Sequence, residues 1–339
     1  MHASPSERDI ARETMFVALG LGVLFAFMIL LSDGEILITR PLWVDEVWTL
    51  LVSSPASPVD VITALAQGAD GGSGLVHLGA WALQKVVGFP SPALLRCISL
   101  VCVLATLCLV YATLRRRFSN DASIAGVLAV GSNYLVVTHA FEARFYGPWL
   151  FCCALAAFAI GRHQAAPSRG SRALLAVASV LLCLVHYYGM ITLALMAAGV
   201  MASHGKRWRE AVPLLEPAAA GLLALLAIVP MAIAVRSSLA VPTWVPDFQP
   251  RQLLALAHQF WIARVPLIAA VALVVGIAVS RTGAGSRTLS SVAHHAASDA
   301  GIVALMSMAL VPLAMAALSM LGQPSMLFRY NIATALAWG

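Results

Sequence analysis

Long apolar stretches separated by short polar ones dominate the pattern of the chain. The first runs from about Thr14 to Leu31, and the others lie near 93–114, 121–138, 145–161, 172–186, 188–203, 211–235, 266–280 and 300–321. A helix rises about 1.5 Å per residue, so roughly 17 to 25 apolar residues can cross a hydrocarbon core of about 30 Å. The pattern predicts an all-α fold, a polytopic transmembrane helical bundle of about nine complete spans with the start of a tenth near Asn331.

The composition also favours a membrane environment. Hydrophobic residues make up 60% of the 339 residues and charged residues only 11%, whereas a soluble protein of this size needs a far more charged surface. The six cysteines all lie in apolar stretches, without the spacing of a zinc site, and are interpreted as small apolar fillers. The net charge of +6 is typical of membrane proteins, whose arginines hold loops in the cytoplasm, so we expect no nucleic-acid partner.

One short apolar stretch, Gly74 to Gly88, decides the predicted topology. If it spans the membrane, the run Arg115-Arg116-Arg117 lies outside. If it is re-entrant or lies along the surface, that run and the later basic clusters all lie in the cytoplasm, as the positive-inside rule favours. We therefore predict that this stretch does not span. The prediction treats residues 1–339 as a single transmembrane domain.

With this topology, the first outer loop covers about residues 32–92 and is too long to be a simple connector. Val44, Val47 and Leu51 would give a surface-lying helix an apolar stripe, so we expect surface-lying helices in the loop. The glycine-rich stretch at 68–74 is interpreted as a flexible turn, because glycine alone does not make a phosphate loop.

Four polar segments are then predicted to emerge together on the outer face. They are Asp45-Glu46, the stretch from His139 to Tyr146, His186-Tyr187-Tyr188, and Phe328-Arg329-Tyr330-Asn331. A carboxylate there can take a proton from an attacking hydroxyl or amine. Arginines can pair with phosphate oxygens and stabilise the charge that develops on them. The pattern suits a transfer reaction in which a lipid phosphate is the leaving group.

Each segment also has a plainer interpretation. Asp45-Glu46 could be part of a solvated loop, the arginines could anchor lipid headgroups, and the tyrosines could belong to an aromatic belt. His186 could simply end a span at the interface. His139 and Glu142, three residues apart, could coordinate a metal.

In their order along the chain, these segments resemble the C-type (GT-C) glycosyltransferases. The resemblance rests on Trp43-Val44-Asp45-Glu46, on the Gly-Leu-Val-His-Leu stretch from Gly74, on Gly88-Phe89-Pro90-Ser91-Pro92 with Leu95-Arg96, on Glu142-Ala143-Arg144-Phe145-Tyr146, on His186-Tyr187-Tyr188 and on Arg329-Tyr330. The likeness is strongest to the bacterial branch of the dolichyl-phosphate-mannose protein mannosyltransferase superfamily. That branch includes aminoarabinose transferases of lipid A and transferases of the lipopolysaccharide core. The resemblance covers essentially the whole chain.

The resemblance implies an activity, a place and a set of site residues. Such enzymes transfer a sugar, with inversion, from a polyprenyl-phosphate donor to a glycan, lipid or protein acceptor, and the resemblance places this chain in the bacterial inner membrane with its site on the periplasmic face. It implies Asp45 as the catalytic base with Glu46 beside it. The other implied residues are Arg144, Arg329 and Arg96 at the donor phosphate, and Glu142, Tyr146, His186, Tyr187 and Tyr330 at the substrate.

The chain also departs from the family pattern. Family members usually continue for further spans, so the resemblance predicts either a truncated or a minimal member. Where many relatives have a His-Pro-Pro stretch leading into the helix after the outer loop, this chain has Gly72-Ser73-Gly74-Leu75-Val76-His77, which leaves contact with the donor at that corner open. No metal ligand is predicted and no cofactor is implied with certainty, although the carboxylate pair could bind a divalent metal.

A transporter or lipid flippase is the alternative function, and a structural or assembly subunit is a further one. Transporters generally carry ionisable groups near the bilayer midplane. The centres of several predicted spans, for example 98–111, 147–160 and 302–320, contain no charged residue. The pattern therefore favours the glycosyltransferase.

Overall fold

The computed structural model describes residues 40–70, 74–89, 91–131, 133–226, 228–230, 233, 248–261, 298–321 and 328–338. Over these ranges the chain is built of α-helices and 3-10 helices and forms no strand. The prediction of a helical protein therefore agrees with the secondary structure of the described chain.

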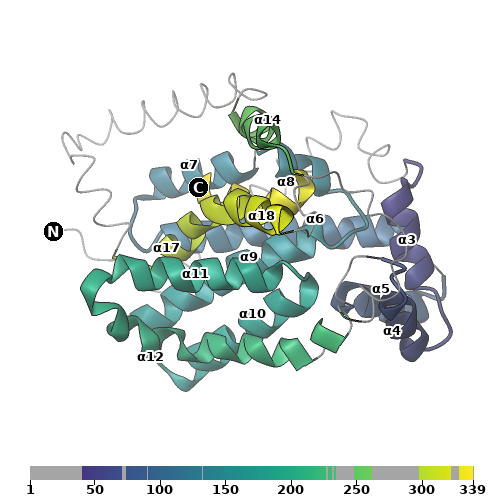
Figure 1. The fold of residues 1–339 in the computed structure, drawn as a ribbon, viewed down its shortest axis with the longest axis horizontal. Helices are drawn as coiled ribbons and strands as arrows, with labels where there is room; N and C mark the ends of the chain where they lie inside the picture. Colours follow the sequence, from purple (N-terminus) through teal and green to yellow (C-terminus); the bar gives the residue numbers. More distant parts are fainter. Residues whose placement is uncertain are drawn as a thin grey trace.

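Three short helices from the predicted first outer loop form a unit at one end of the molecule (Figure 1). They are α3 (Val44–Val52), α4 (Pro58–Ala66) and α5 (Leu75–Val87). The unit has its own apolar cluster, in which Val61 and Leu65 of α4 are fully buried. Because it is closed by its own core, this unit can present its polar residues at a fixed place against the main body.

The apolar stripe expected on the first of these helices is only partly where it was predicted. Val44 and Leu51 of α3 are 63% and 58% exposed, together with Trp48 at 47%, whereas Val47 is half-buried. The exposed stripe therefore runs along Val44, Trp48 and Leu51.

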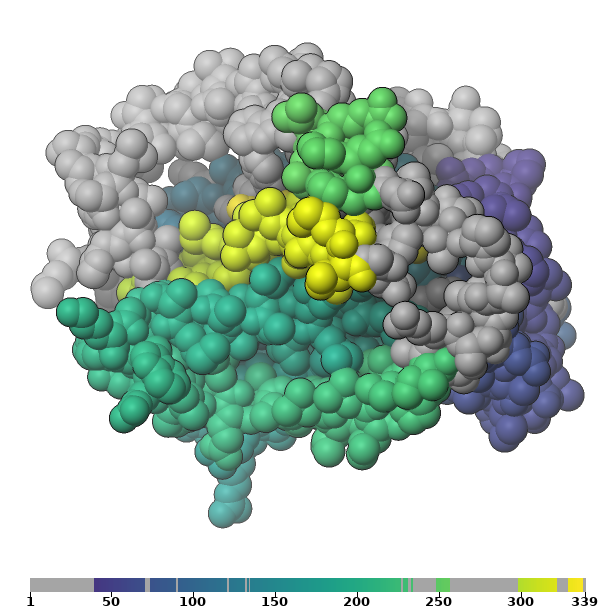
Figure 2. Space-filling view, viewed as in Figure 1, coloured from purple at the N-terminus to yellow at the C-terminus, as the bar shows by residue number. Residues whose placement is uncertain are grey.

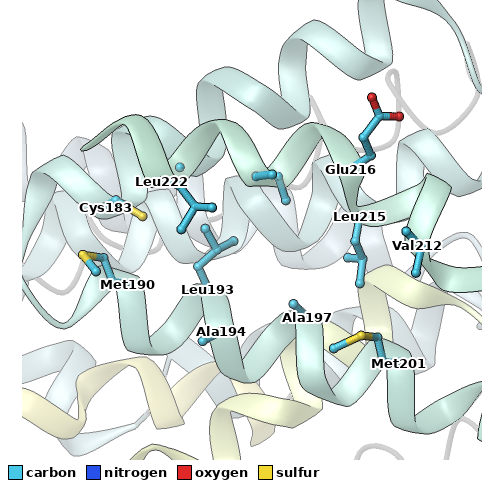
Figure 3. A pocket seen from close by; sticks show the side chains of 13 residues that line it. Cys183, Met190, Leu193, Ala194, Ala197, Met201, Val212, Leu215, Glu216 and Leu222 are labelled. Atoms are coloured by element: carbon cyan, nitrogen blue, oxygen red, sulfur yellow. The ribbon is translucent and has the colours of Figure 1, made fainter. Parts of the chain in front are cut away.

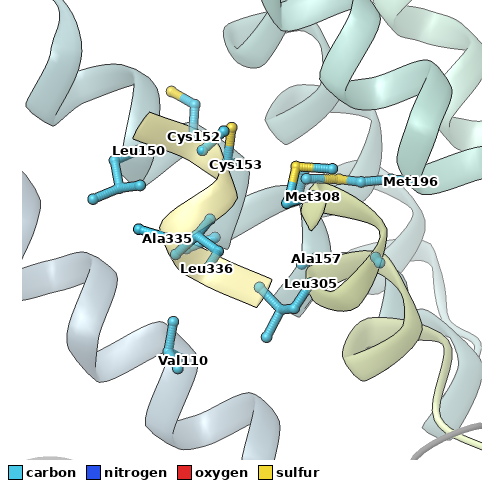
Figure 4. Close-up of a cluster of buried hydrophobic side chains, with 14 of the residues drawn as sticks. Val110, Leu150, Cys152, Cys153, Ala157, Met196, Leu305, Met308, Ala335 and Leu336 are labelled. Atoms are coloured by element: carbon cyan, nitrogen blue, oxygen red, sulfur yellow. The ribbon is translucent and has the colours of Figure 1, made fainter. Parts of the chain in front are cut away.

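The main body is centred on α9 (Tyr146–Ala165), whose neighbours α6 (Pro92–Leu114), α10 (Arg169–Val185) and α17 (Ala300–Ser307) pack along it. The close approach of α6 and α9 depends on Gly147, because a Cβ there would lie 2.4 Å from Ser99 Oγ of α6. Figure 4 shows part of the buried core, where Cys152, Cys153, Leu305, Met308 and Leu336 meet from helices far apart in the sequence.

The remaining elements surround this core. They are α7 (Asn120–Gly131), α8 (Tyr134–His139), α11 (Gly189–Ser203), η1 (Gly205–Ala211), α12 (Val212–Leu215), η2 (Glu216–Ala224), α14 (Pro250–Trp261), η4 (Met308–Leu310), α18 (Val311–Met320) and η5 (Phe328–Trp338). In the space-filling view, the C-terminal helices, in yellow, lie between α11 and α14 (Figure 2). The last element, η5, also packs against α8 and α9, which brings the end of the chain beside the segment that joins those two helices.

The predicted bundle of about nine complete spans with the start of a tenth is wrong. Among the described residues, only two helices are long and apolar enough to cross a membrane, Pro92–Leu114 and Ala300–Met320. This criterion uses length and composition alone. The predicted spans near 14–31 and 266–280 lie outside the described residues.

The physical reason is that several apolar stretches do not form one long helix. The stretch at 188–203 forms α11 with 15 residues, which is roughly 22 Å long and short of a hydrocarbon core of about 30 Å. The stretch at 121–138 is divided between α7 and α8, and Asn133 caps the second of them. The predicted span beginning at 211 is divided among η1, α12 and η2, with Pro213 and Pro217 at the starts of the last two.

Candidate functional site

The first turn of α3 carries both residues of the acidic pair. Asp45 and Glu46 lie near the helix N-terminus, where negative charge is favourable, and the Glu46 carboxylate accepts the backbone N–H of Trp43 at 3.4 Å. Successive helix residues point about 100° apart. The two carboxylates therefore face different surroundings and can have different roles.

The Glu46 carboxylate is fully buried and joins three segments. Arg96 of α6 donates to it through Nε at 2.9 Å and Nη2 at 2.6 Å, and the backbone N–H of Ala143 donates at 2.9 Å. Burial favours the protonated acid, but the hydrogen bonds from Arg96 and Ala143 outweigh it and lower the pKa of Glu46.

These contacts change the roles that the resemblance implied for Arg96 and Glu46. Arg96 is 1% exposed and also donates to the Arg40 carbonyl at 2.8 Å, so its guanidinium is directed into protein and not toward a donor phosphate. Glu46 likewise has no exposed surface. The geometry favours both as residues that hold α3 in place, and it leaves Asp45 as the more exposed carboxylate of the acidic pair.

Asp45 faces the C-terminal segment. Its Oδ2 lies 2.6 Å from Nη1 of Arg329, and the two side chains are 15% and 14% exposed. The contact is an ion pair without the alignment of a hydrogen bond at that oxygen. The Arg329 guanidinium also lies 5.3 Å from the ring of Trp43 and 5.9 Å from that of Tyr330, within range of cation–π attraction.

Arg144 lies between the α3 unit and the start of α9. Its Nη1 donates to the Asp45 carbonyl and to Thr49 Oγ1, both at 2.9 Å. Nη1 and Nη2 also donate to Oδ2 and Oδ1 of Asp70, at 2.5 and 3.1 Å. Burial disfavours the guanidinium, but the adjacent Asp70 carboxylate outweighs it and raises the pKa of Arg144. Arg144 is therefore a permanent cation that is already engaged by protein groups.

His186 ends α10 inside an aromatic cluster. Its ring stacks on Trp149 at 4.6 Å and lies 4.4 Å from Phe145, 5.0 Å from Tyr188 and 5.7 Å from Tyr330. Burial, with the positive charge of Arg144, lowers the pKa of His186 to about 3. The backbone N–H of Tyr188 donates to Nδ1 at 3.1 Å. The imidazole is thus neutral at physiological pH, and Nδ1 acts as an acceptor.

The other predicted substrate residues lie around this cluster. Burial raises the pKa of Tyr146 and Tyr330, and raises that of Tyr187 to about 12, so all three phenols keep their protons. Glu142 is buried, and its Oε2 lies 2.8 Å from His139 Nδ1. It faces His139 and so does not line an open surface.

Two residues at this site were missed by sequence reasoning. Asp70 lies within the stretch interpreted as a flexible turn, and His77 belongs to the stretches that were compared with the family, without a predicted role. The structure places Asp70 against Arg144, and His77 Nε2 lies 2.9 Å from Asp70 Oδ2. Burial opposes ionisation, but the hydrogen bond from His77 and the charge of Arg144 hold the pKa of Asp70 well below its usual range. No local spacing in the sequence signals this contact.

The metal interpretation of His139 and Glu142 has no third ligand to support it. In the part of the chain that the structure describes, no group of three or more His, Cys, Asp or Glu side chains is placed to hold a metal ion. The two residues instead pair with each other.

An apolar groove of about 470 Å³ lies between α10, α11 and the segment from α12 to η2 (Figure 3). Its walls include Cys183, Leu193, Ala197 and Leu222, and one charged residue, Glu216, lines it. Cys183, one of the wall residues, also belongs to the apolar cluster on which Tyr187 packs.

Comparison of the chain with models of known families, with curated proteins and with solved structures finds no match. The functional argument therefore rests on the residues of this chain and on their geometry.

Proposed function

We propose that the protein is a membrane glycosyltransferase, similar to the GT-C enzymes, that transfers a sugar from a polyprenyl-phosphate donor to an acceptor at the outer face of the bacterial inner membrane. The observation that carries the proposal is the contact between Asp45 and Arg329. The Asp45 carboxylate can accept a proton, and the Arg329 guanidinium can bind a phosphate. The contact brings these two groups together from opposite ends of the chain, at a partly exposed place.

The roles follow from the buried partners of Arg144 and from the greater exposure of Arg329. Arg144 has three protein acceptors, among them the two-pronged carboxylate of Asp70, so a phosphate would have to displace a buried partner. Arg329 is more exposed, and its ion pair with Asp45 lacks hydrogen-bond alignment. We therefore assign the donor phosphate to Arg329, and give Arg144 the role of holding the turn that bears Asp45.

The reaction balances with these groups alone. The acceptor oxygen or nitrogen attacks the anomeric carbon from the face opposite the phosphate, and the bond between that carbon and the phosphate oxygen breaks. Asp45 takes the proton of the acceptor. The polyprenyl phosphate leaves with the bonding electron pair and one more negative charge, which the guanidinium of Arg329 stabilises. The configuration of the sugar is inverted.

Two further features support a lipid-linked donor. The described part of the chain contains two helices that are long and apolar enough to cross a membrane, one of which, α6, begins directly after the α3 unit. The apolar groove beside Tyr187 has the size and lining of a site for a hydrocarbon chain. A donor with its phosphate at Arg329 could place its isoprenoid chain there.

The test compares cells that carry the wild-type protein, Asp45→Asn, or Asp60→Asn. Asp60 is an exposed acid of α4 in the same unit, so its variant removes an equal charge away from the site. Loss of a general base costs about 10²- to 10⁴-fold in rate. We expect Asp45→Asn to abolish sugar transfer to the surface glycans while lipid-linked sugar accumulates, with unchanged protein in the membrane fraction. An active Asp45→Asn protein would disprove the assignment.

A further inference from the structure

Arg144 contacts the first turn of α3 through its guanidinium. The hydrogen bonds of its Nη1 to the Asp45 carbonyl and to Thr49 Oγ1 span one turn of the helix. Since the Asp45 carboxylate extends from the same turn, any shift of the Arg144 guanidinium changes where that carboxylate lies. The position of the proposed base therefore depends on Arg144 as well as on the Glu46–Arg96 pair.

Asp70 fixes Arg144 in turn. The two carboxylate oxygens accept from both terminal nitrogens of the guanidinium, an arrangement that sets orientation as well as distance. The side chains of Arg144 and Asp70 are 5% and 7% exposed. Because both charges are shielded from water, neither can exchange its partner for solvent without a large cost.

His77 of α5 is the last member of this chain of contacts. It is 1% exposed, its Nε2 meets Asp70, and its Nδ1 is buried without a hydrogen-bond partner. A hydrogen on Nδ1 would be buried with no acceptor, whereas a hydrogen on Nε2 is accepted by Asp70. The contact thus favours a hydrogen on Nε2, which donates to Asp70.

Apolar packing alone already closes the unit of α3, α4 and α5, through the cluster around Val61 and Leu65. The polar contacts from His77 through Asp70 to Arg144 add no helix cap. They connect the three-helix unit to the segment before α9. They are therefore suited to fix the first turn of α3 relative to the main body, where Arg329 lies.

We propose that Asp70 and His77 are positioning residues of the transfer reaction, which hold the Asp45 carboxylate in register with Arg329 by fixing Arg144. This inference rests on the proposed function for its catalytic consequence. The mechanical link from His77 to the first turn of α3 stands on the geometry alone, and it can be measured without any transfer assay.

Two substitutions at His77 separate this role from mere filling of space. The side-chain amide of glutamine can place an N–H close to the position of Nε2, whereas asparagine is shorter and reaches the position of Nδ1. His77→Gln therefore keeps the donor to Asp70, and His77→Asn loses it. Both variants remove the ring, so a role in packing alone would affect them similarly.

The first measurement is hydrogen exchange of the full-length proteins in detergent micelles. We expect His77→Asn to speed exchange of the α3 amides while those in the middle of α9 are unchanged, and His77→Gln to exchange as the wild type does. Equal exchange in the two variants would overturn the link. This result does not depend on what reaction the protein performs.

The second measurement pairs sugar transfer in cells with binding of farnesyl phosphate, a soluble probe of the donor phosphate and chain. A misplaced base reduces turnover strongly, since about 1 Å can cost roughly 100-fold. We expect His77→Asn to lose at least roughly tenfold in transfer while it binds farnesyl phosphate no more weakly than the wild type does, because a displaced Asp45 carboxylate competes less for Arg329. His77→Gln should restore transfer.

The outcomes separate the two ideas. Faster α3 exchange in His77→Asn with normal transfer would overturn the positioning role and leave the proposed function intact. A wild-type protein that neither transfers sugar nor binds farnesyl phosphate would contradict the proposed function, and the exchange data would still decide whether His77 and Asp70 hold α3.

Discussion

Asp45 and Arg329 pair across almost the whole length of the chain, with 2.6 Å between Oδ2 and Nη1. A donor phosphate must compete with the Asp45 carboxylate for that guanidinium. When the phosphate takes the arginine, the carboxylate is freed to accept a proton. The same contact would thus keep the empty site closed and would couple donor binding to activation of the base.

Asp45→Asn should therefore have opposite effects on binding and on transfer. Removing the competing negative charge should tighten binding of farnesyl phosphate, by severalfold for a partly exposed pair worth about 1 kcal/mol, while transfer is lost. Isothermal titration of the purified protein in micelles measures the affinity. Asp60→Asn is the matched control and should leave it unchanged. Weaker binding in Asp45→Asn would mean that Asp45 does not compete with the phosphate.

Binding of the donor phosphate should depend on the two-pronged geometry of the Arg329 guanidinium as well as on its charge. Arg329→Ala removes the phosphate partner, and a hydrogen bond to a charged group is worth about 1.5 to 3 kcal/mol, so farnesyl phosphate should bind at least roughly tenfold more weakly. Arg329→Lys keeps the charge but loses two-pronged pairing, and should lie between. Arg251, an exposed arginine of α14, supplies the control Arg251→Ala. Equal affinity in wild type and Arg329→Ala would move the phosphate site elsewhere.

The sequence located most of the polar residues that the structure brings together, because these segments stand out as polar clusters in an apolar chain, although the nine-span topology that grouped them on one face is wrong. Arg144 and Arg329 both lie within reach of Asp45, and His186 lies beside Tyr330. What the sequence could not show is which carboxylate each arginine engages. Asp45 and Glu46 are adjacent in the chain, yet one is buried against Arg96 and the other is partly open.

The contacts of Asp70 could not be predicted from its surroundings in the sequence. It follows a left-handed glycine, Gly68 at φ 83°, and the local pattern is that of a turn. Its partners Arg144 and His77 are joined to it only by tertiary folding. The fold prediction failed for a related reason, since an apolar stretch gives the length of a segment but not whether one continuous helix fills it. The two short elements α12 and η2, each with a proline near its start, are an example.

Arg96 and Glu46 should be required for stability before anything else. Truncating one member of a buried ion pair leaves the other charged and unpaired, at a cost of about 3 to 5 kcal/mol. Arg96→Ala should therefore lower the midpoint of thermal unfolding strongly, or prevent folding. The double variant Arg96→Met with Glu46→Leu removes both charges and should recover much of the loss. Denaturation in micelles measures it, and a mild Arg96→Ala with no recovery in the double variant would contradict the prediction.

The apolar groove can be tested by filling it. Ala197 of α11 lines the groove, whereas its neighbour Ala198 is exposed and does not. Ala197→Trp should weaken binding of farnesyl phosphate about tenfold, because losing the burial of roughly two methylene groups costs that much. Inorganic phosphate should bind both proteins alike, since it has no chain. If Ala198→Trp weakened the lipid probe equally, the chain would lie outside the groove.

His186 should make the free energy of unfolding depend on pH in a range where Glu46 and Asp70 do not contribute. Its pKa is about 3 in the fold against 6.5 ordinarily, so below pH 6.5 the unfolded chain takes up a proton that the folded protein does not. The free energy of unfolding should then fall by about 1.4 kcal/mol per pH unit from this group, and its full contribution is present above pH 6.5. Glu46 and Asp70 have lowered pKa values and ordinary values of 4.5 and 3.8, so they add their losses only at lower pH.

The measurement is chemical unfolding in micelles between pH 6.5 and 4.5. His186→Asn keeps an acceptor for the Tyr188 N–H but has no group that titrates, so its stability should be nearly flat across this window. His204, at the end of α11 and partly exposed, gives the matched control His204→Asn, which should retain the wild-type slope. A wild-type slope in His186→Asn would show that the aromatic cluster does not hold this imidazole neutral, and it would remove the reason to treat Nδ1 as an acceptor.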